Sequence, residues 1–117
     1  MTARPKVEMN EWVAVCKLTD IVPDTGVCAL VNGLQVAVFR LQDDSVYALD
    51  NLDPFSRANV LSRGIVGDLK GELVVASPVY KQHFNLVTGQ CLEEVDVRIA
   101  VYPARIDGDT VLVNIKN

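Results

Sequence analysis

The side chains of this sequence best suited to chemistry are one histidine, His83, and three cysteines. Together with Tyr80, Asp53 and Cys91, His83 could form a mononuclear metal site, because imidazole, thiolate and carboxylate are common metal ligands. One imidazole with hard, unmatched oxygen ligands lacks the ligand number and the supporting hydrogen bonds that a transition metal needs. We therefore predict no metal site and place His83 on the surface or in loop packing.

The cysteines are candidate nucleophiles, which need a neighbouring base and a group that orients it. Cys16 and Cys28 fall inside predicted strands, where a free cysteine packs as a small apolar residue, so both are expected in the core. Cys91 follows a turn and is expected to be partly exposed, with no partner near it in the sequence. An odd cysteine number, no C-x-x-C pair and no apolar leader segment predict a cytoplasmic protein.

The charged residues exclude several further kinds of function. Asp and Glu lie mainly in predicted turns, and no Gly-rich phosphate loop or Ser-His-Asp arrangement is present, so no independent catalytic activity is expected. The net charge is −4 and the 11 Lys and Arg residues are scattered, which argues against nucleic acid as a partner. Apolar stretches are no longer than a strand, far short of the roughly 20 residues that cross a bilayer, so no membrane span is expected.

The elements that must position these residues are predicted to be strands. Period-two alternation and β-branched runs dominate, and no long stretch has the helical period. The predicted strands cover residues 12–16, 28–31, 34–40, 46–50, 72–77, 97–106 and 110–115. A chain of 117 residues suits a single domain, here an antiparallel sandwich or small barrel, with residues 1–9 as a flexible tail.

Predicted turns connect these strands and indicate which of them form hairpins. Asn32-Gly33 predicts a type I′ hairpin turn, because both central residues of that turn need positive φ. Pro103 predicts an edge strand or a bulge, and residues 107–109 predict a closing hairpin between the last two strands. Residues 51–71 are polar and irregular and are predicted to form one long loop with a functional role.

Two segments carry a pattern beyond strand propensity. They are Asn51-Leu52-Asp53-Pro54-Phe55-Ser56 and, after a strand, Ser77-Pro78-Val79-Tyr80 followed by Phe84-x-Leu86-x-Thr88-Gly89. Both resemble the cluster-binding loops of Rieske ferredoxins. In that family Cys-Pro-His and Cys-Pro-x-His each supply one thiolate and one imidazole to a [2Fe–2S] centre, and the second loop continues into Phe-x-Leu-x-Thr-Gly.

The ligands of that family are replaced in this sequence. The two cysteine positions fall on Asp53 and Ser77, and the two histidine positions fall on Phe55 and Tyr80. Carboxylate, hydroxyl, phenyl and phenol groups cannot substitute as a set for two thiolates and two imidazoles. The resemblance therefore implies a Rieske-like fold, with two loops at one tip, that holds no cofactor of its own.

The resemblance covers nearly the whole chain, including the first strand and the closing hairpin. A ligand-free Rieske domain of this length resembles, more narrowly, the small subunit of the cytoplasmic assimilatory NADH-dependent nitrite reductase. That resemblance implies a role beside a large subunit, which carries FAD, sirohaem and a [4Fe–4S] cluster and reduces nitrite to ammonium. The implied role of this chain is then non-catalytic.

Two other functions stay open. One is an electron-carrying Rieske-type ferredoxin of an aromatic-ring dioxygenase system, which would be brown and contain iron. The other is a stand-alone module that binds a small ligand or another protein. A colourless, iron-free protein would exclude the first of these functions.

The resemblance also implies where a partner binds. The ligand histidines of a Rieske domain lie at an exposed tip, so Phe55 and Tyr80 are expected side by side there, filling the volume of the absent cluster. The expected partner-facing segments are residues 51–63 and 77–88. The candidate partner-binding residues are Asp53, Phe55, Arg57, Tyr80, Lys81 and His83.

Overall fold

The computed structural model describes residues 11–115, in which all regular structure is β-strand apart from two short 3-10 helices, η1 (Leu18–Asp20) and η2 (Leu61–Arg63). The all-β class is therefore confirmed, whereas the tail predicted at residues 1–9 lies outside the described residues. The strands are β1 (Trp12–Lys17), β2 (Thr25–Val31), β3 (Leu34–Arg40), β4 (Val46–Asp50), β5 (Leu52–Asp53), β6 (Ala58–Asn59), β7 (Ile65–Leu69), β8 (Glu72–Ala76), β9 (His83–Asn85), β10 (Val101–Tyr102), β11 (Ala104–Asp107) and β12 (Thr110–Asn114). Neither of the helices described is long and apolar enough to cross a membrane.

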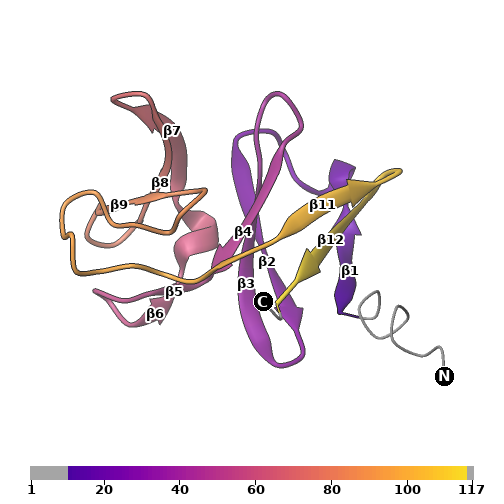
Figure 1. The fold of residues 1–117 in the computed structure, drawn as a ribbon, viewed down its shortest axis with the longest axis horizontal. Helices are drawn as coiled ribbons and strands as arrows, with labels where there is room; N and C mark the ends of the chain where they lie inside the picture. Colours follow the sequence, from indigo (N-terminus) through magenta and orange to yellow (C-terminus); the bar gives the residue numbers. More distant parts are fainter. Residues whose placement is uncertain (1–10, 116–117) are drawn as a thin grey trace, which may run out of the picture.

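The strands form three layers (Figure 1). A four-stranded sheet in the order β10-β4-β3-β2 stands in the middle, with the sheet β1-β12-β11 on one side of it. The sheet β7-β8-β9 and the short β5-β6 hairpin form the third layer on the other side. All the strand pairs are antiparallel, as the sequence predicts.

Strand β3 joins the two hydrophobic cores because it is covered on both faces. Val36 and Val38 are fully buried on the face toward β12, whereas Ala37 and Phe39 are fully buried on the opposite face, toward β8 and β9. A strand that is buried on both faces has a continuous apolar run instead of an alternating one. Full burial of one such side chain stabilises the fold by about 1.5–3 kcal/mol.

The hairpin prediction is confirmed at the first turn and was incomplete at a later one. Asn32 and Gly33 have φ angles of 50° and 84°, as a type I′ turn requires. A second two-residue turn of the same kind, Lys70-Gly71, joins β7 to β8, so the prediction of one irregular loop over residues 51–71 is wrong for β7. Strand β7 contains Gly67 and an aspartate, both of which have low strand propensity, and this hid it.

Pro103 separates two edge strands that belong to different sheets. Strand β10 pairs with β4 and β11 pairs with β12, so the single strand predicted over residues 97–106 is wrong, while the expected edge position is confirmed. Pro103 has no N–H to donate, but its carbonyl accepts a hydrogen bond from Asn114 N at 3.0 Å. The proline thus lies at the point where the chain passes from the central layer to the outer one.

Gly89 offers a test of how tightly the end of the third layer is packed. A Cβ atom added at Gly89 (φ 78°) would clash with the Ile99 carbonyl oxygen, whereas one added at Gly108 (φ 66°) would meet nothing within 4 Å. We expect Gly108→Ala to cost about 1–2 kcal/mol through its left-handed backbone alone. Gly89→Ala adds a steric clash and should cost more than about 3 kcal/mol in urea unfolding. Equal costs for the two variants would contradict this packing.

Candidate functional site

Two loops of the third layer come together where the sequence pattern places the Rieske ligands. Loop 1 (residues 53–58) joins β5 to β6, and loop 2 (residues 77–82) joins β8 to β9; together they are called the tip. Each loop begins with a fully buried polar residue, Asp53 in loop 1 and Ser77 in loop 2. The Ser77 hydroxyl donates a hydrogen bond to Asp53 Oδ2 at 2.5 Å. The residues at the two cysteine positions therefore bind each other and hold the loops together.

The two loops have equivalent backbone turns. In loop 1 the Asp53 carbonyl accepts from Arg57 N at 2.7 Å, and Asp53 Oδ1 accepts from Phe55 N at 2.9 Å. In loop 2 the Ser77 carbonyl accepts from Lys81 N at 3.1 Å, and its hydroxyl accepts from Val79 N at 3.3 Å. Both turns thus use the first residue as a double acceptor, toward the second and the fourth residue after it.

Asn51 holds the segment that leads into loop 1, and it was not among the predicted site residues. Its side chain is 1% exposed; Oδ1 accepts from Ser62 N at 2.7 Å, and Nδ2 donates to the Asn59 carbonyl at 3.1 Å and to Gln35 Oε1 at 3.2 Å. These bonds connect β3, β6 and η2 at one point. A polar residue two positions before the Asp-Pro pair was the available signal.

The Asp53 carboxylate is ionised although it is buried. Burial raises its pKa, but hydrogen bonds from Ser77, Phe55 and Ser56 outweigh burial and hold the pKa below the usual value for an aspartate. Hydrogen bonds to an ionised acceptor are stronger than those to a neutral one. The charged form is thus the form that holds the tip together.

This ionisation predicts a pH dependence of stability. A carboxyl group with a lower pKa in the folded chain stabilises the fold above its unfolded pKa of about 3.9, and this contribution is lost as the pH falls through the folded pKa. We expect the free energy of unfolding in urea to be steady near neutral pH and to decline below about pH 4. Asp53→Asn should show a shallower decline, and an identical pH profile for the two proteins would contradict this role of Asp53.

The prediction that Phe55 and Tyr80 fill the cluster volume is half correct. Phe55 is partly buried and packs on the fully buried Phe84, with ring centroids 6.2 Å apart. Tyr80 is 60% exposed and does not fill the site. The Asp53–Ser77 hydrogen bond, and not a contact of Tyr80, joins the two loops.

His83 is half-buried and is held by Glu93, not by the other candidate residues. Its backbone N–H donates to Glu93 Oε1 at 2.8 Å, and its Nδ1 lies 2.6 Å from Glu93 Oε2. Burial raises the pKa of Glu93, but the bonds and charge of His83 outweigh it and lower that pKa. Within residues 11–115 no three His, Cys, Asp or Glu side chains are grouped to hold a metal ion.

The cysteine predictions need two corrections. Cys28 is exposed rather than in the core, because β2 is an edge strand and this residue faces outward. Cys91 is only 2% exposed, because it pairs with Phe84 in the core. Cys16 is half-buried and packs against the core, as predicted. Burial raises the thiol pKa of both Cys16 and Cys91, which disfavours a reactive thiolate at either.

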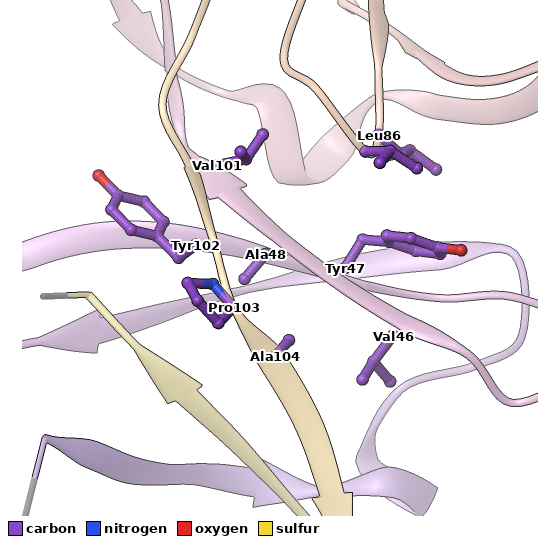
Figure 2. Close-up of a pocket in the computed structure, with 9 residues that line it drawn as sticks. Val46, Tyr47, Ala48, Leu86, Val101, Tyr102, Pro103 and Ala104 are labelled. Carbon is purple, nitrogen blue, oxygen red and sulfur yellow. The ribbon is translucent and has the colours of Figure 1, made fainter. Parts of the chain in front are cut away.

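A groove of about 430 Å³ lies where β4 meets β10 and β11 (Figure 2). Tyr47 and Tyr102 stand on opposite sides of it, and their hydroxyl groups point away from each other. Burial, and then the Asp50 carboxylate, raise the pKa of Tyr102, so its phenol stays neutral. The groove is lined mainly by apolar side chains; the lining residues are Val46, Tyr47, Ala48, Leu86, Val87, Val101, Tyr102, Pro103 and Ala104.

The tip does not fit a [2Fe–2S] cluster. Its four ligand positions hold a carboxylate, a phenyl ring, a hydroxyl and a phenol, whereas such clusters need thiolates with imidazoles or further thiolates. Asp53 and Ser77 already satisfy each other, and Phe55 packs against the core. Three of the four side chains at the ligand positions, those of Asp53, Ser77 and Phe55, thus hold the loops through protein contacts.

Comparisons with known proteins agree with this description. Residues 11–114 match the model of the Rieske-like [2Fe-2S] domain family. The nitrite reductase (NADH) small subunit of Salmonella typhimurium is 48% identical over 104 residues, covering 88% of this chain and 96% of that protein. The nitrite reductase [NAD(P)H] large subunit of Klebsiella oxytoca is 40% identical over 109 residues, which cover 93% of this chain and 11% of that protein.

Solved structures give the same result. The Escherichia coli protein NirD superposes with a TM-score of 0.84 at 44% identity, covering 91% of this chain and 97% of that one. The ferredoxin of carbazole 1,9a-dioxygenase from Nocardioides aromaticivorans IC177 superposes with a TM-score of 0.77 at 28% identity, covering 90% of this chain and 98% of that one. The chain belongs to the Rieske-like domain family and, within it, to the group of NADH nitrite reductase small subunits.

Proposed function

We propose that the chain is a non-catalytic small subunit that binds the large subunit of a cytoplasmic NADH nitrite reductase. The large subunit carries FAD, sirohaem and a [4Fe–4S] cluster and reduces nitrite to ammonium, so the chemistry takes place there. The observation that carries the proposal is the Asp53–Ser77 hydrogen bond, because it puts protein contacts where an electron-carrying relative needs cluster ligands. A tip that is held by protein contacts can bind a partner protein without a cluster.

The match to the Klebsiella oxytoca protein supports a physical association. A segment homologous to nearly all of this chain makes up 11% of a protein named as a large subunit. When a domain and its partner occur in one chain in one organism, they commonly associate as separate chains in another. The family membership and this match therefore both favour a complex with the large subunit.

The tip is the proposed contact surface, and the candidate residues divide into two sets. Arg57, Tyr80 and Lys81 are exposed, so they are placed to touch a partner. Asp53 is fully buried and Phe55 is partly buried, so these two hold the tip in shape. His83 is half-buried and bonded to Glu93, which gives it the same supporting role.

Co-expression with a tagged large subunit tests this function directly. We expect the untagged chain to elute with the large subunit in affinity and size-exclusion chromatography, and nitrite reduction to be absent from the chain alone. A stable monomer that never associates with a flavin- and sirohaem-containing large subunit would contradict the proposal.

The similarity to the carbazole dioxygenase ferredoxin keeps an electron-carrying role as the second candidate function. That role needs a redox centre, and the residues at the tip do not fit one. Iron analysis and a visible spectrum of the chain, purified from cells that assemble iron–sulfur proteins, separate the two functions. A brown protein with iron would favour the ferredoxin role, and a colourless one would leave the small-subunit role.

A further inference from the structure

A path of three hydrogen bonds links the two exposed cations of the tip. Arg57 N donates to the Asp53 carbonyl at 2.7 Å, and Lys81 N donates to the Ser77 carbonyl at 3.1 Å. The side chains of Asp53 and Ser77 are themselves bonded at 2.5 Å. The relative position of Arg57 and Lys81 therefore depends on the bond that stands where the cluster ligands would be.

Both cations also have the same unusual backbone conformation. Arg57 has a φ angle of 62° and Lys81 a φ angle of 70°. This left-handed region suits glycine or asparagine better than a long side chain. The two loops thus each have a cation at the same place in the turn, in a conformation that glycine or asparagine adopts more readily.

The charge of the tip is opposite to that of the whole chain. The chain has a net charge of −4, whereas the only acid in loops 1 and 2 is Asp53, which is fully buried. Arg57 and Lys81 are exposed, and among the described residues neither forms an ion pair. Val79 and Tyr80, which are 44% and 60% exposed, precede Lys81 and add an apolar surface.

We propose that Arg57 and Lys81 form a cationic pair that binds an acidic surface of the large subunit, with their spacing set by the Asp53–Ser77 hydrogen bond. The inference rests on the proposed function and names the chemistry of its contact surface. Charge complementarity selects an acidic partner surface, and the exposed Val79 and Tyr80 select a protein surface over a small anion, which would leave them uncovered.

Charge reversal at the tip tests the contact. In a titration of the purified large subunit at about 0.15 M salt, we expect Arg57→Glu/Lys81→Glu to weaken binding at least about tenfold. The matched control is Lys17→Glu/Lys70→Glu, which changes the net charge equally at exposed positions outside the tip and should stay within about twofold of the wild type.

The results of that titration either support or overturn this contact surface. Wild-type binding that weakens with added salt, together with loss only in the tip variant, supports the inference. Wild-type binding with an unaffected tip variant, or equal weakening in both variants, overturns this contact surface while leaving the proposed function in place. No binding of the wild-type chain at all overturns the inference and the proposed function together.

The positioning role of the Asp53–Ser77 bond needs its own variant. Ser77→Ala removes this bond and the acceptor of Val79 N, but keeps the backbone hydrogen bonds of Ser77 to Gln82 and Lys81. We expect faster amide hydrogen exchange at Arg57 and Lys81 and about three- to tenfold weaker binding to the large subunit, because the cations lose their fixed spacing. Ser45→Ala removes another Ser–Asp bond, in the β3–β4 turn, and should change neither. Unchanged exchange and binding in Ser77→Ala would overturn the positioning role.

Discussion

Asp53→Ala is expected to lower the free energy of unfolding by about 2–4 kcal/mol. The variant removes the acceptor for Ser77 Oγ and for Phe55 N, and Asp53 is fully buried, so water cannot replace it freely. Buried donors left without an acceptor account for most of the cost. Urea unfolding followed by circular dichroism measures it.

Two matched variants show whether the charge or the hydrogen bonds matter more. Asp53→Asn keeps one oxygen acceptor but not the charge, so an intermediate loss is expected. Asp107→Ala changes an exposed aspartate near the β11–β12 turn and should stay within about 0.5 kcal/mol of the wild type. If Asp53→Ala cost no more than Asp107→Ala, the Asp53–Ser77 bond could not be what holds the tip together.

Phe84→Ala is expected to cost about 3–5 kcal/mol, because it leaves a large cavity in the core beneath the tip. The Phe84 ring is 0% exposed, and the Phe55 ring packs against it. Phe84 lies on β9, which follows loop 2, and its backbone pairs with Cys91. Losing it should also loosen loop 1. Urea unfolding gives the global cost, and amide exchange in residues 53–58 gives the local one.

Phe84→Leu is the control for that prediction. A leucine keeps most of the apolar volume, so its cost should be clearly smaller than that of alanine. A cost below about 1 kcal/mol for Phe84→Ala would mean that the core under the tip collapses easily around the missing ring. The tip would then depend on its hydrogen bonds alone.

The sequence predicts this fold well where local chemistry decides the structure. Asn32-Gly33 has a local preference for positive φ at both positions, and Pro103 disfavours a central strand position because it has no N–H to donate. Strand β7 was missed because Gly67 and Asp68 have weak strand propensity, which its hairpin pairing with β8 overrides.

The site was predictable in position but not in detail. The Asp-Pro and Ser-Pro pairs locate both loops, yet the Asp53–Ser77 bond joins residues 24 positions apart, and nothing in the local pattern links them. The same limit applies to Tyr80, which was expected to fill the cluster volume and is exposed. It also applies to Cys91, which was expected to be partly exposed and is buried beside Phe84. Burial of a loop residue depends on what packs over it, which a single sequence does not contain.

The similarity to a dioxygenase ferredoxin shows how much of the fold is independent of a cluster. The two folds superpose over most of both chains at 28% identity. In this chain a buried ionic hydrogen bond and an aromatic contact hold the two loops at the same place in the sequence pattern. The scaffold can therefore present its tip to a partner without a cofactor.

Titration of the iron-free chain into the purified large subunit tests this account most directly. The chain is first treated with a chelator, and iron analysis verifies that none remains. The account predicts saturable binding that is the same before and after this treatment. Binding that appears only after reconstitution of an iron–sulfur cluster in the chain would contradict it.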